Sequence, residues 1–157
     1  MTLNLLIMRG ISGSGKSTRA KEYLTALSDT QQKVIIVCRD DLRLALYNKE
    51  FGAPINEGFI TDVEFNIIET ALSKGISVIS DNTHLAPKYV HPKIELAKRF
   101  DAFPTLVEVS ATLTAAQDRN VRRASKGGRF VPTEVINSQY EQYLSHQQEV
   151  RSLFDAF

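Results

Sequence analysis

The sequence predicts an α/β fold in which a central parallel sheet is covered by helices on both faces. Short apolar runs alternate with longer amphipathic segments, and a glycine-rich loop directly follows the first apolar run. Helices that return over a parallel sheet form right-handed crossovers. The 157 residues, 43% of them hydrophobic, suffice for one core, so we expect a single domain over residues 1–157.

Four apolar runs are short, rich in branched residues and nearly continuous, as buried parallel strands are. We expect strands at residues 3–8, 34–38, 76–80 and 104–109. Helices are expected at residues 15–27 and 60–73, and Pro87 suits the first turn of another. The last helix should start near Pro132 and carry one apolar stripe of Ile136, Tyr140, Tyr143, Leu144, Val150 and Phe154.

Charge and cysteine content set the broad class of the protein. The 19 Lys and Arg nearly balance the 18 Asp and Glu, so composition neither supports nor excludes nucleic acid as a partner. The lone Cys38 cannot form an internal disulfide, and we expect a buried thiol there. No apolar run approaches the roughly 20 residues that span a bilayer, and no secretory signal is recognisable. We therefore expect no membrane association and a cytoplasmic protein.

Residues 10–17 fit the pattern G-x-x-x-x-G-K-[ST] between an expected strand and an expected helix. Such a loop turns backbone N–H groups toward phosphate oxygens, and the helix adds the positive end of its dipole. Lys16 should bridge the β- and γ-phosphates of ATP or another nucleoside triphosphate, and the Ser17 hydroxyl should ligate Mg²⁺. The expected ATP-binding loop residues are Gly10, Ser12, Gly13, Ser14, Gly15, Lys16, Ser17 and Thr18.

The loop alone does not identify an acceptor, because kinases, switches and motors share it. Ligands of parallel sheets bind beyond the carboxyl ends of the strands, and Asp40 follows the second strand. Asp40 suits the orientation and deprotonation of a hydroxyl, and Arg43, one helical turn later, could hold an acceptor phosphate. The alternative is that Asp40 or Asp41 caps a helix and Arg43 is a solvated charge; we expect one of these aspartates to be a cap.

The third strand ends in Asp81-Asn82-Thr83, which faces the same crevice. In many phosphate-loop enzymes such an acid helps to hold Mg²⁺, directly or through water. A turn acid that only ends the strand is the plain alternative.

Positive charge clusters at Arg119, Arg122, Arg123, Lys126 and Arg129. The first three would share a helix face and could close over a triphosphate, while Gly127 and Gly128 would permit a lid motion. For Lys126 and Arg129 we expect a solvated helix face.

With these motifs in place, the chain resembles the kinase half of the phage polynucleotide kinase-phosphatase family. The resemblance rests on the loop, on Arg39-Asp40-Asp41-Leu42-Arg43, on Ser80-Asp81-Asn82-Thr83, on Arg119-Asn120 with Arg123, and on Val131-Pro132, so it covers nearly the whole chain. It implies the P-loop kinase fold: a central parallel sheet with helices on both faces and a helical lid.

The resemblance also implies an ATP- and Mg²⁺-dependent kinase that phosphorylates the 5'-hydroxyl end of DNA or RNA, in the host cytoplasm if the protein is phage-encoded. Asp40 would be the general base, Arg43 would contact the acceptor, and Arg123 would stabilise the donor phosphates. Lys16 completes the expected catalytic set, and Arg119 the ATP-binding set. The stretch 123–131 looks a few residues longer than in the family, which leaves the choice among Arg119, Arg122 and Arg123 open.

In that family the acid matching Asp81 helps to position the acceptor arginine. We favour this role for Asp81, with Asn82 and Thr83 also on the acceptor side, because Asp40 and Arg43 already define an acceptor site beside it. The resembled proteins often carry a phosphatase domain with an Asp-x-Asp motif, and this sequence has none. If the chain is intact we expect kinase activity alone; the alternative is a fragment that lacks the phosphatase domain.

Two rival functions remain open. A small-molecule kinase on the same fold would have a closed pocket in place of an open groove. An ATP-binding switch would need no acceptor chemistry. Between Tyr47 and Phe59, a loop of suitable length could grip an acceptor, although a plain connection is expected. The apolar tail of Leu153, Phe154 and Phe157 would pack on the domain or form a homo-oligomer contact.

Overall fold

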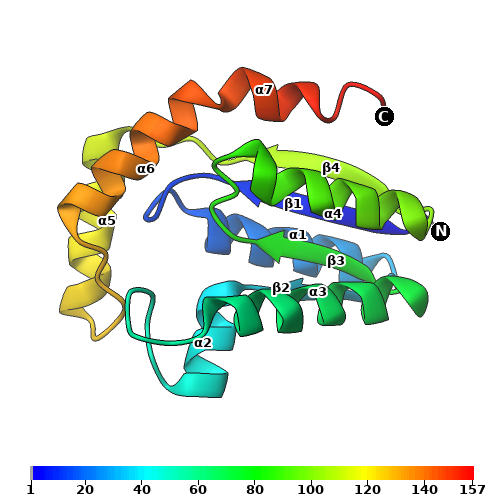
Figure 1. Ribbon diagram of the computed structural model, residues 1–157, viewed down its shortest axis with the longest axis horizontal. Coiled ribbons are helices and arrows are strands. Elements are labelled where there is room, and N and C mark those ends of the chain that lie inside the picture. Colours follow the sequence, from blue (N-terminus) through cyan, green and yellow to red (C-terminus); the bar gives the residue numbers. More distant parts are fainter. Residues whose placement is uncertain (1) are drawn as a thin grey trace.

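The structure is a computed structural model that describes residues 2–157, and its centre is a parallel sheet (Figure 1). Within those residues the strands are β1 (Asn4–Arg9), β2 (Val34–Val37), β3 (Ser77–Asp81) and β4 (Phe103–Glu108), in the spatial order β2-β3-β1-β4. Every neighbouring pair is parallel. The predicted α/β fold with a central parallel sheet is confirmed, and the strand bounds shift only slightly.

Helices cover both faces of this sheet. Helix α1 (Lys16–Asp29) packs on one face, while α3 (Glu57–Ser73) and α4 (Pro87–Arg99) pack on the other. Pro87 occupies the first turn of α4, as predicted, where its missing N–H costs nothing. The short helix α2 (Arg39–Tyr47) starts directly beyond β2, at the carboxyl end of the sheet.

The remaining helices stand across the carboxyl ends of the strands, on the left of Figure 1, and then return over the sheet. Helices α5 (Leu113–Ser125) and α6 (Thr133–Ser145) pack against each other, and α7 (Gln147–Ser152) contacts α4. Helices α5 and α6 form the expected helical lid.

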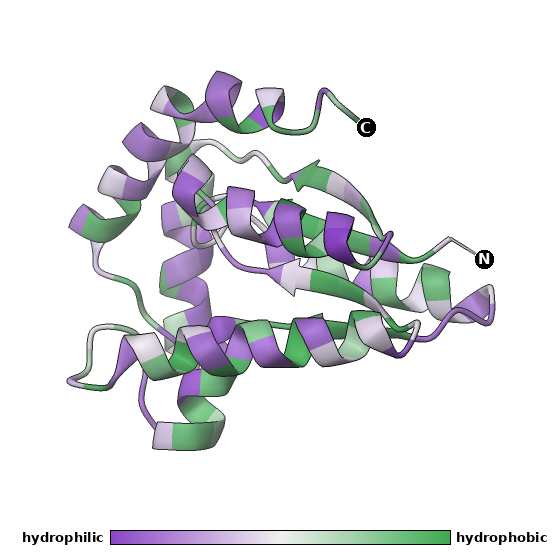
Figure 2. Cartoon of the chain, turned by 45° about the vertical axis from the view of Figure 1, so that its right-hand side comes forward, coloured by the Kyte–Doolittle hydropathy of each residue, from purple (hydrophilic) through white to green (hydrophobic). Residues whose placement is uncertain are grey.

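Alternation along β1 builds two apolar layers. Leu5 and Ile7 face the side of α3 and α4, whereas Leu6 and Met8 face α1. The strands are therefore mostly hydrophobic in Figure 2, while the helices alternate in colour. A third apolar cluster joins the lid to the loop after β1 and consists of Ile11, Leu85, Ala116, Val131, Ile136 and Tyr143.

The prediction of one continuous last helix is wrong, because the chain bends at His146 between α6 and α7. The bend lets Ile136 pack in the lid cluster while Val150 packs in the sheet core. Leu144, expected on the buried stripe, is 53% exposed. Leu153 and Phe154 pack on the sheet core, and the ring of Phe157 contacts Phe103 edge-on at 6.4 Å.

Two further expectations concern exposure and membranes. Cys38 is only half-buried, because it is the N-cap residue of α2 at the edge of the crevice. Burial nevertheless raises the pKa of its thiol to about 11. No helix in the described part of the chain is long and apolar enough to cross a membrane.

The layered core predicts a clear contrast between two leucines. Leu5→Ala should lower the free energy of unfolding by about 2–5 kcal/mol, since it opens a cavity at a fully buried position of the central strand. Leu44→Ala, at a position 49% exposed on α2, should stay within about 0.5 kcal/mol of wild type. Urea denaturation measures both, and equal losses would contradict this account of the core.

Candidate active site

The loop between β1 and α1 curls tightly because three glycines allow it. Gly13 and Gly15 have φ of 80° and 97°, which side chains of L-residues rarely accept. A Cβ on Gly10 would lie 2.5 Å from the carbonyl oxygen of Val109, and one on Gly13 would lie 2.3 Å from that of Ala116. At Gly10 and Gly13 the loop is thus pressed against the residue that follows β4 and against the lid helix α5, with no room there for a larger side chain.

The loop side chains suit a bound triphosphate with Mg²⁺. Lys16 is 8% exposed, and its Nζ donates to the carbonyl oxygen of Ile11 over 3.1 Å, inside the loop. Ser14 Oγ is buried without a hydrogen-bond partner in residues 2–157, as expected of a group that awaits a ligand. Burial lowers the pKa of Lys16, an effect that the carboxylates of Asp81 and Asp40 oppose.

Asp81 lies beside the residue expected to bind the metal. Ser17 Oγ donates to Asp81 Oδ2 over 2.8 Å, and Asp81 is 5% exposed. None of the hydrogen bonds or ion pairs of Arg43 within the described chain involves Asp81. The Ser17–Asp81 hydrogen bond therefore favours a role for Asp81 in holding Mg²⁺ over the role in positioning Arg43 that we expected from the sequence.

The two residues after Asp81 hold the crevice together. Asn82 Oδ1 accepts the backbone N–H of Arg39 over 2.9 Å and so caps α2, while its Nδ2 donates to Glu64 over 2.6 Å. The carbonyl oxygen of Thr83 accepts the N–H of Gly10 over 3.2 Å. Their contact with an acceptor stays a prediction, but both residues already position the site.

Asp40 is held by two guanidinium groups. Its Oδ1 lies 2.8 Å from Arg43 Nη1, and its Oδ2 lies 2.6 Å from Nη1 of Arg129. The expectation that Asp40 or Asp41 caps the helix is wrong, because Cys38 is the N-cap residue and both aspartates lie within the first turn. The expectation of a solvated Arg129 is wrong too, since the segment after α5 carries this arginine to the exit of β2.

Arg43 is fixed from a second side by Glu57, at the start of α3. Arg43 Nε donates to Glu57 over 2.8 Å, and Arg39 Nη2 donates to the same carboxylate over 3.1 Å. Burial raises the pKa of Glu57, but hydrogen bonds and charge from Arg43 and Arg39 outweigh this, so the net shift is downward. Arg43 itself is 6% exposed, so it is a buried hydrogen-bond donor whose orientation is already fixed, and not a solvated charge.

The lid arginines line a common pocket, but they differ in their contacts. Arg119 Nη1 donates to the carbonyl oxygens of Gly13 and Ser14, so it reaches the phosphate loop. Arg123 Nη2 donates to Asn120, and its Nε donates to the carbonyl oxygen of Arg129. A pocket of about 440 Å³ is lined by Arg119, Arg122, Arg123, Lys126 and Gly128.

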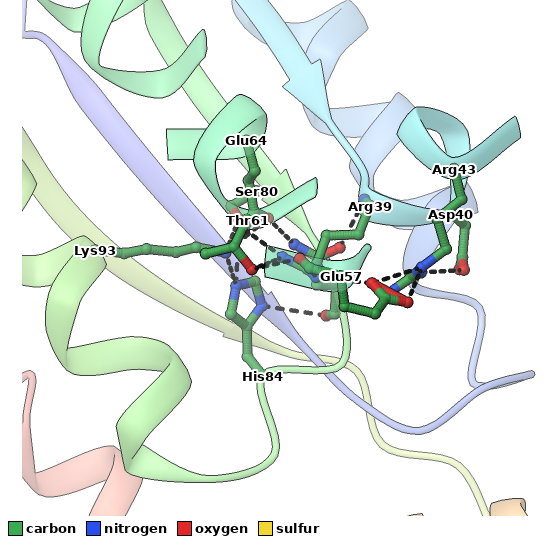
Figure 3. A network of polar contacts seen from close by, with 10 residues as sticks. Arg39, Asp40, Arg43, Glu57, Thr61, Glu64, Ser80, His84 and Lys93 are labelled. Atoms are coloured by element: carbon green, nitrogen blue, oxygen red, sulfur yellow. Dashed lines mark hydrogen bonds and ion pairs between the residues drawn. The ribbon is translucent and has the colours of Figure 1, made fainter. Parts of the chain in front are cut away.

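A polar network links α2 and α3 to Lys93 of α4, to Ser80 of β3 and to His84 (Figure 3). Lys93 Nζ donates to Glu64 over 3.1 Å, to Ser80 over 2.8 Å and to His84 Nε2 over 2.8 Å. His84 Nδ1 lies 2.5 Å from the carbonyl oxygen of Met8, which assigns the proton to Nδ1 and leaves Nε2 as the acceptor. Burial and the charge of Lys93 hold the pKa of His84 well below 6.5.

Sequence reasoning missed Glu57, Arg129 and this network. Asn56 accepts the N–H of Phe59 and caps α3, so a helix start near Glu57 was detectable. The partner of Glu57 was not, because it lies on another helix. No signal in the sequence distinguished Arg129 from its neighbours.

A glycine-rich loop between a central parallel strand and a helix, a basic helical lid, and an acid beside the loop serine define a P-loop ATP-binding, kinase-like domain. The chain belongs to the family described as AAA domain, which matches residues 5–148.

Solved structures agree with this fold. A chain of the Pnkp1/Rnl/Hen1 RNA repair complex is 25% identical, with a TM-score of 0.80 over 98% of this chain and 47% of that chain. The AvrRxo1-ORF1:-ORF2 complex with ATP gives 22% identity and a TM-score of 0.76 over 99% of this chain and 51% of that chain. Kti12 of Chaetomium thermophilum with ADP-AlF3 gives 18% identity and a TM-score of 0.71 over 88% of this chain and 79% of that chain. The chain thus spans about half the length of the first two.

The neutral, buried His84 predicts a loss of stability in acid. Below the ordinary pKa of 6.5 the unfolded chain takes up a proton that the folded chain does not, so the free energy of unfolding falls as pH falls. From about pH 7 to about pH 5.5, wild type should lose about 1 kcal/mol more than His84→Asn. Asn tolerates the φ of 46° at this position. Denaturation at both pH values measures this, and parallel losses would refute a neutral His84.

Proposed function

We propose that the chain is an ATP-dependent 5'-hydroxyl polynucleotide kinase, which transfers the γ-phosphate of ATP to the 5'-OH end of DNA or RNA. The observation that carries this proposal is the place of Asp40. Its carboxylate lies in the first turn of α2, directly beyond β2 and therefore at the same end of the parallel sheet as the phosphate loop, and it forms an ion pair with the buried Arg43. A carboxylate there can serve an acceptor hydroxyl that is aligned with the phosphate held by the loop.

In the proposed reaction the 5'-oxygen of the acceptor forms a bond to the γ-phosphorus, the bond to the bridging oxygen breaks, and ADP leaves. The hydroxyl proton passes to Asp40, which is a weak base and takes it late, as the new bond forms. Lys16, with Arg119 and Arg123 from the lid, neutralises charge on the phosphates. Ser17 and Asp81 would hold Mg²⁺, which supplies further charge neutralisation on the triphosphate.

The positive charge around Asp40 favours a nucleic acid as the acceptor. Arg43 and Arg129 flank Asp40, and Arg43 uses Nε and Nη1 for Glu57 and Asp40, which leaves Nη2 unpaired in residues 2–157. Two guanidinium groups beside the general base Asp40 suit an acceptor that carries a phosphodiester next to the reacting hydroxyl. A simple sugar has no phosphodiester. The likeness to a chain of an RNA repair complex supports a nucleic acid as the acceptor.

Asp40→Asn should keep ATP binding but lower transfer by roughly 100-fold or more, because the amide cannot accept the hydroxyl proton. Asp41→Asn is the matched control, since Asp41 lies one residue further along the same turn and faces solvent. Transfer of labelled γ-phosphate to 5'-OH DNA and RNA oligonucleotides measures the reaction, and titration calorimetry with ATP measures binding.

Equal turnover in wild type and Asp40→Asn would refute the role of Asp40. Labelling of sugars or nucleosides, with none of the oligonucleotides, would move the function to a small-molecule kinase on the same fold. Absence of any transfer would favour an ATP-binding switch.

Asp81→Asn should raise the Mg²⁺ concentration for half-maximal transfer several-fold, because Asp81 shares the metal side of the loop with Ser17. The KM for the oligonucleotide should change little. Steady-state kinetics over a Mg²⁺ series separates the two roles of Asp81, and a raised acceptor KM with an unchanged Mg²⁺ requirement would assign it to the acceptor side.

A further inference from the structure

Phe51, in the connection between α2 and α3, is an aromatic side chain that the core does not use. It is 61% exposed and belongs to none of the three apolar clusters formed within residues 2–157. The guanidinium carbon of Arg43 lies 5.1 Å from the centroid of its ring. One side of Phe51 is thus turned to the acceptor arginine, and the rest of the ring is open.

The connection that carries Phe51 leads from α2 to α3 and approaches the lid. Glu50, the neighbour of Phe51, is close enough to Arg123 to influence that guanidinium electrostatically. The lid residue Arg129 reaches Asp40 over 2.6 Å from the opposite side. An acceptor that enters between these elements with its hydroxyl at Asp40 would pass Arg43 and then Phe51.

We propose that Phe51 is a stacking platform for the nucleobase of the acceptor's 5'-terminal nucleotide. The inference rests on the proposed function and adds a second recognition element to it. Asp40 receives the hydroxyl, Arg43 contacts the adjacent phosphate, and Phe51 receives the flat face of the base. Stacking tolerates every base, because each has a π-face, so the platform selects for the presence of a base and not for its identity.

The Arg43–Phe51 contact gives the platform a fixed position. A guanidinium over an aromatic ring is attractive and holds the exposed side chain near the acceptor site before substrate arrives. Glu57 and Asp40 fix Arg43 in turn, so the orientation of Phe51 depends on the same ion pairs as the acceptor site.

The test pairs two oligonucleotides with two kinds of variant. One oligonucleotide has an ordinary 5'-terminal nucleotide; the other has a 5'-terminal tetrahydrofuran residue, which keeps the 5'-hydroxyl and phosphate but lacks the base. Wild type should show a KM about 5- to 150-fold lower for the oligonucleotide with the base, at similar kcat. Phe51→Leu, apolar but without a π-face, should abolish this preference by raising the KM for the base-bearing oligonucleotide alone.

Phe51→Trp should retain the preference. Phe103→Ala is the control for loss of an exposed phenylalanine, since Phe103 is 46% exposed at the start of β4, the opposite end of the sheet. Intact transfer with the same preference in Phe51→Leu as in wild type would overturn the platform and leave the kinase proposal standing. Transfer by wild type to neither oligonucleotide would overturn both. A fall in kcat for both oligonucleotides in Phe51→Leu would overturn stacking in favour of support for Arg43.

Discussion

The close packing of the phosphate loop is the constraint on which the rest of the structure depends. Gly10 and Gly13 bring the loop backbone against the carbonyl oxygens of Val109 and Ala116, so β4 and the lid helix fix its curl. Preorganised N–H groups are effective because they need no rearrangement when charge develops. The strand order also helps to fix the loop, because β1, which leads into it, lies between β3 and β4 and is hydrogen-bonded to both.

The proposed acceptor side is held together by ion pairs between side chains, and not by close packing of the backbone. Glu64 lies between Lys93 and Arg39, and Glu57 lies between Arg39 and Arg43, so α2, α3 and α4 are joined by ion pairs behind the crevice. Buried ion pairs add little net stability, because desolvation offsets the attraction between the charges. Their contribution here is geometric: Arg43 is held between Asp40 and Glu57, and these two ion pairs fix the orientation of its guanidinium group.

The positions of the strands could be predicted from the sequence, whereas the contacts between distant side chains could not. Short apolar runs located the strands, and the parallel topology then placed Asp40, Asp81 and the loop at one edge, because parallel strands end on the same side. The partners of those residues were beyond reach. Glu57 and Arg129 are distant along the chain from Asp40 and Arg43, and no motif in the sequence indicates that these residues pair. The bend at His146 also escaped notice, since Ile136 and Val150 fit one helical stripe although they belong to different clusters.

Helix α1 begins at Lys16 without a side-chain cap, because its N-cap residue is Gly15. Its first N–H groups therefore have no partner from a capping side chain, and a phosphate is the ligand that would satisfy them. Nucleotide binding and folding are then thermodynamically linked: a ligand at 100 times its Kd stabilises the folded state by about 2.7 kcal/mol. That gain is comparable to the cost of truncating one core leucine, so the resistance of this protein to heat and proteolysis should follow the nucleotide supply of its surroundings.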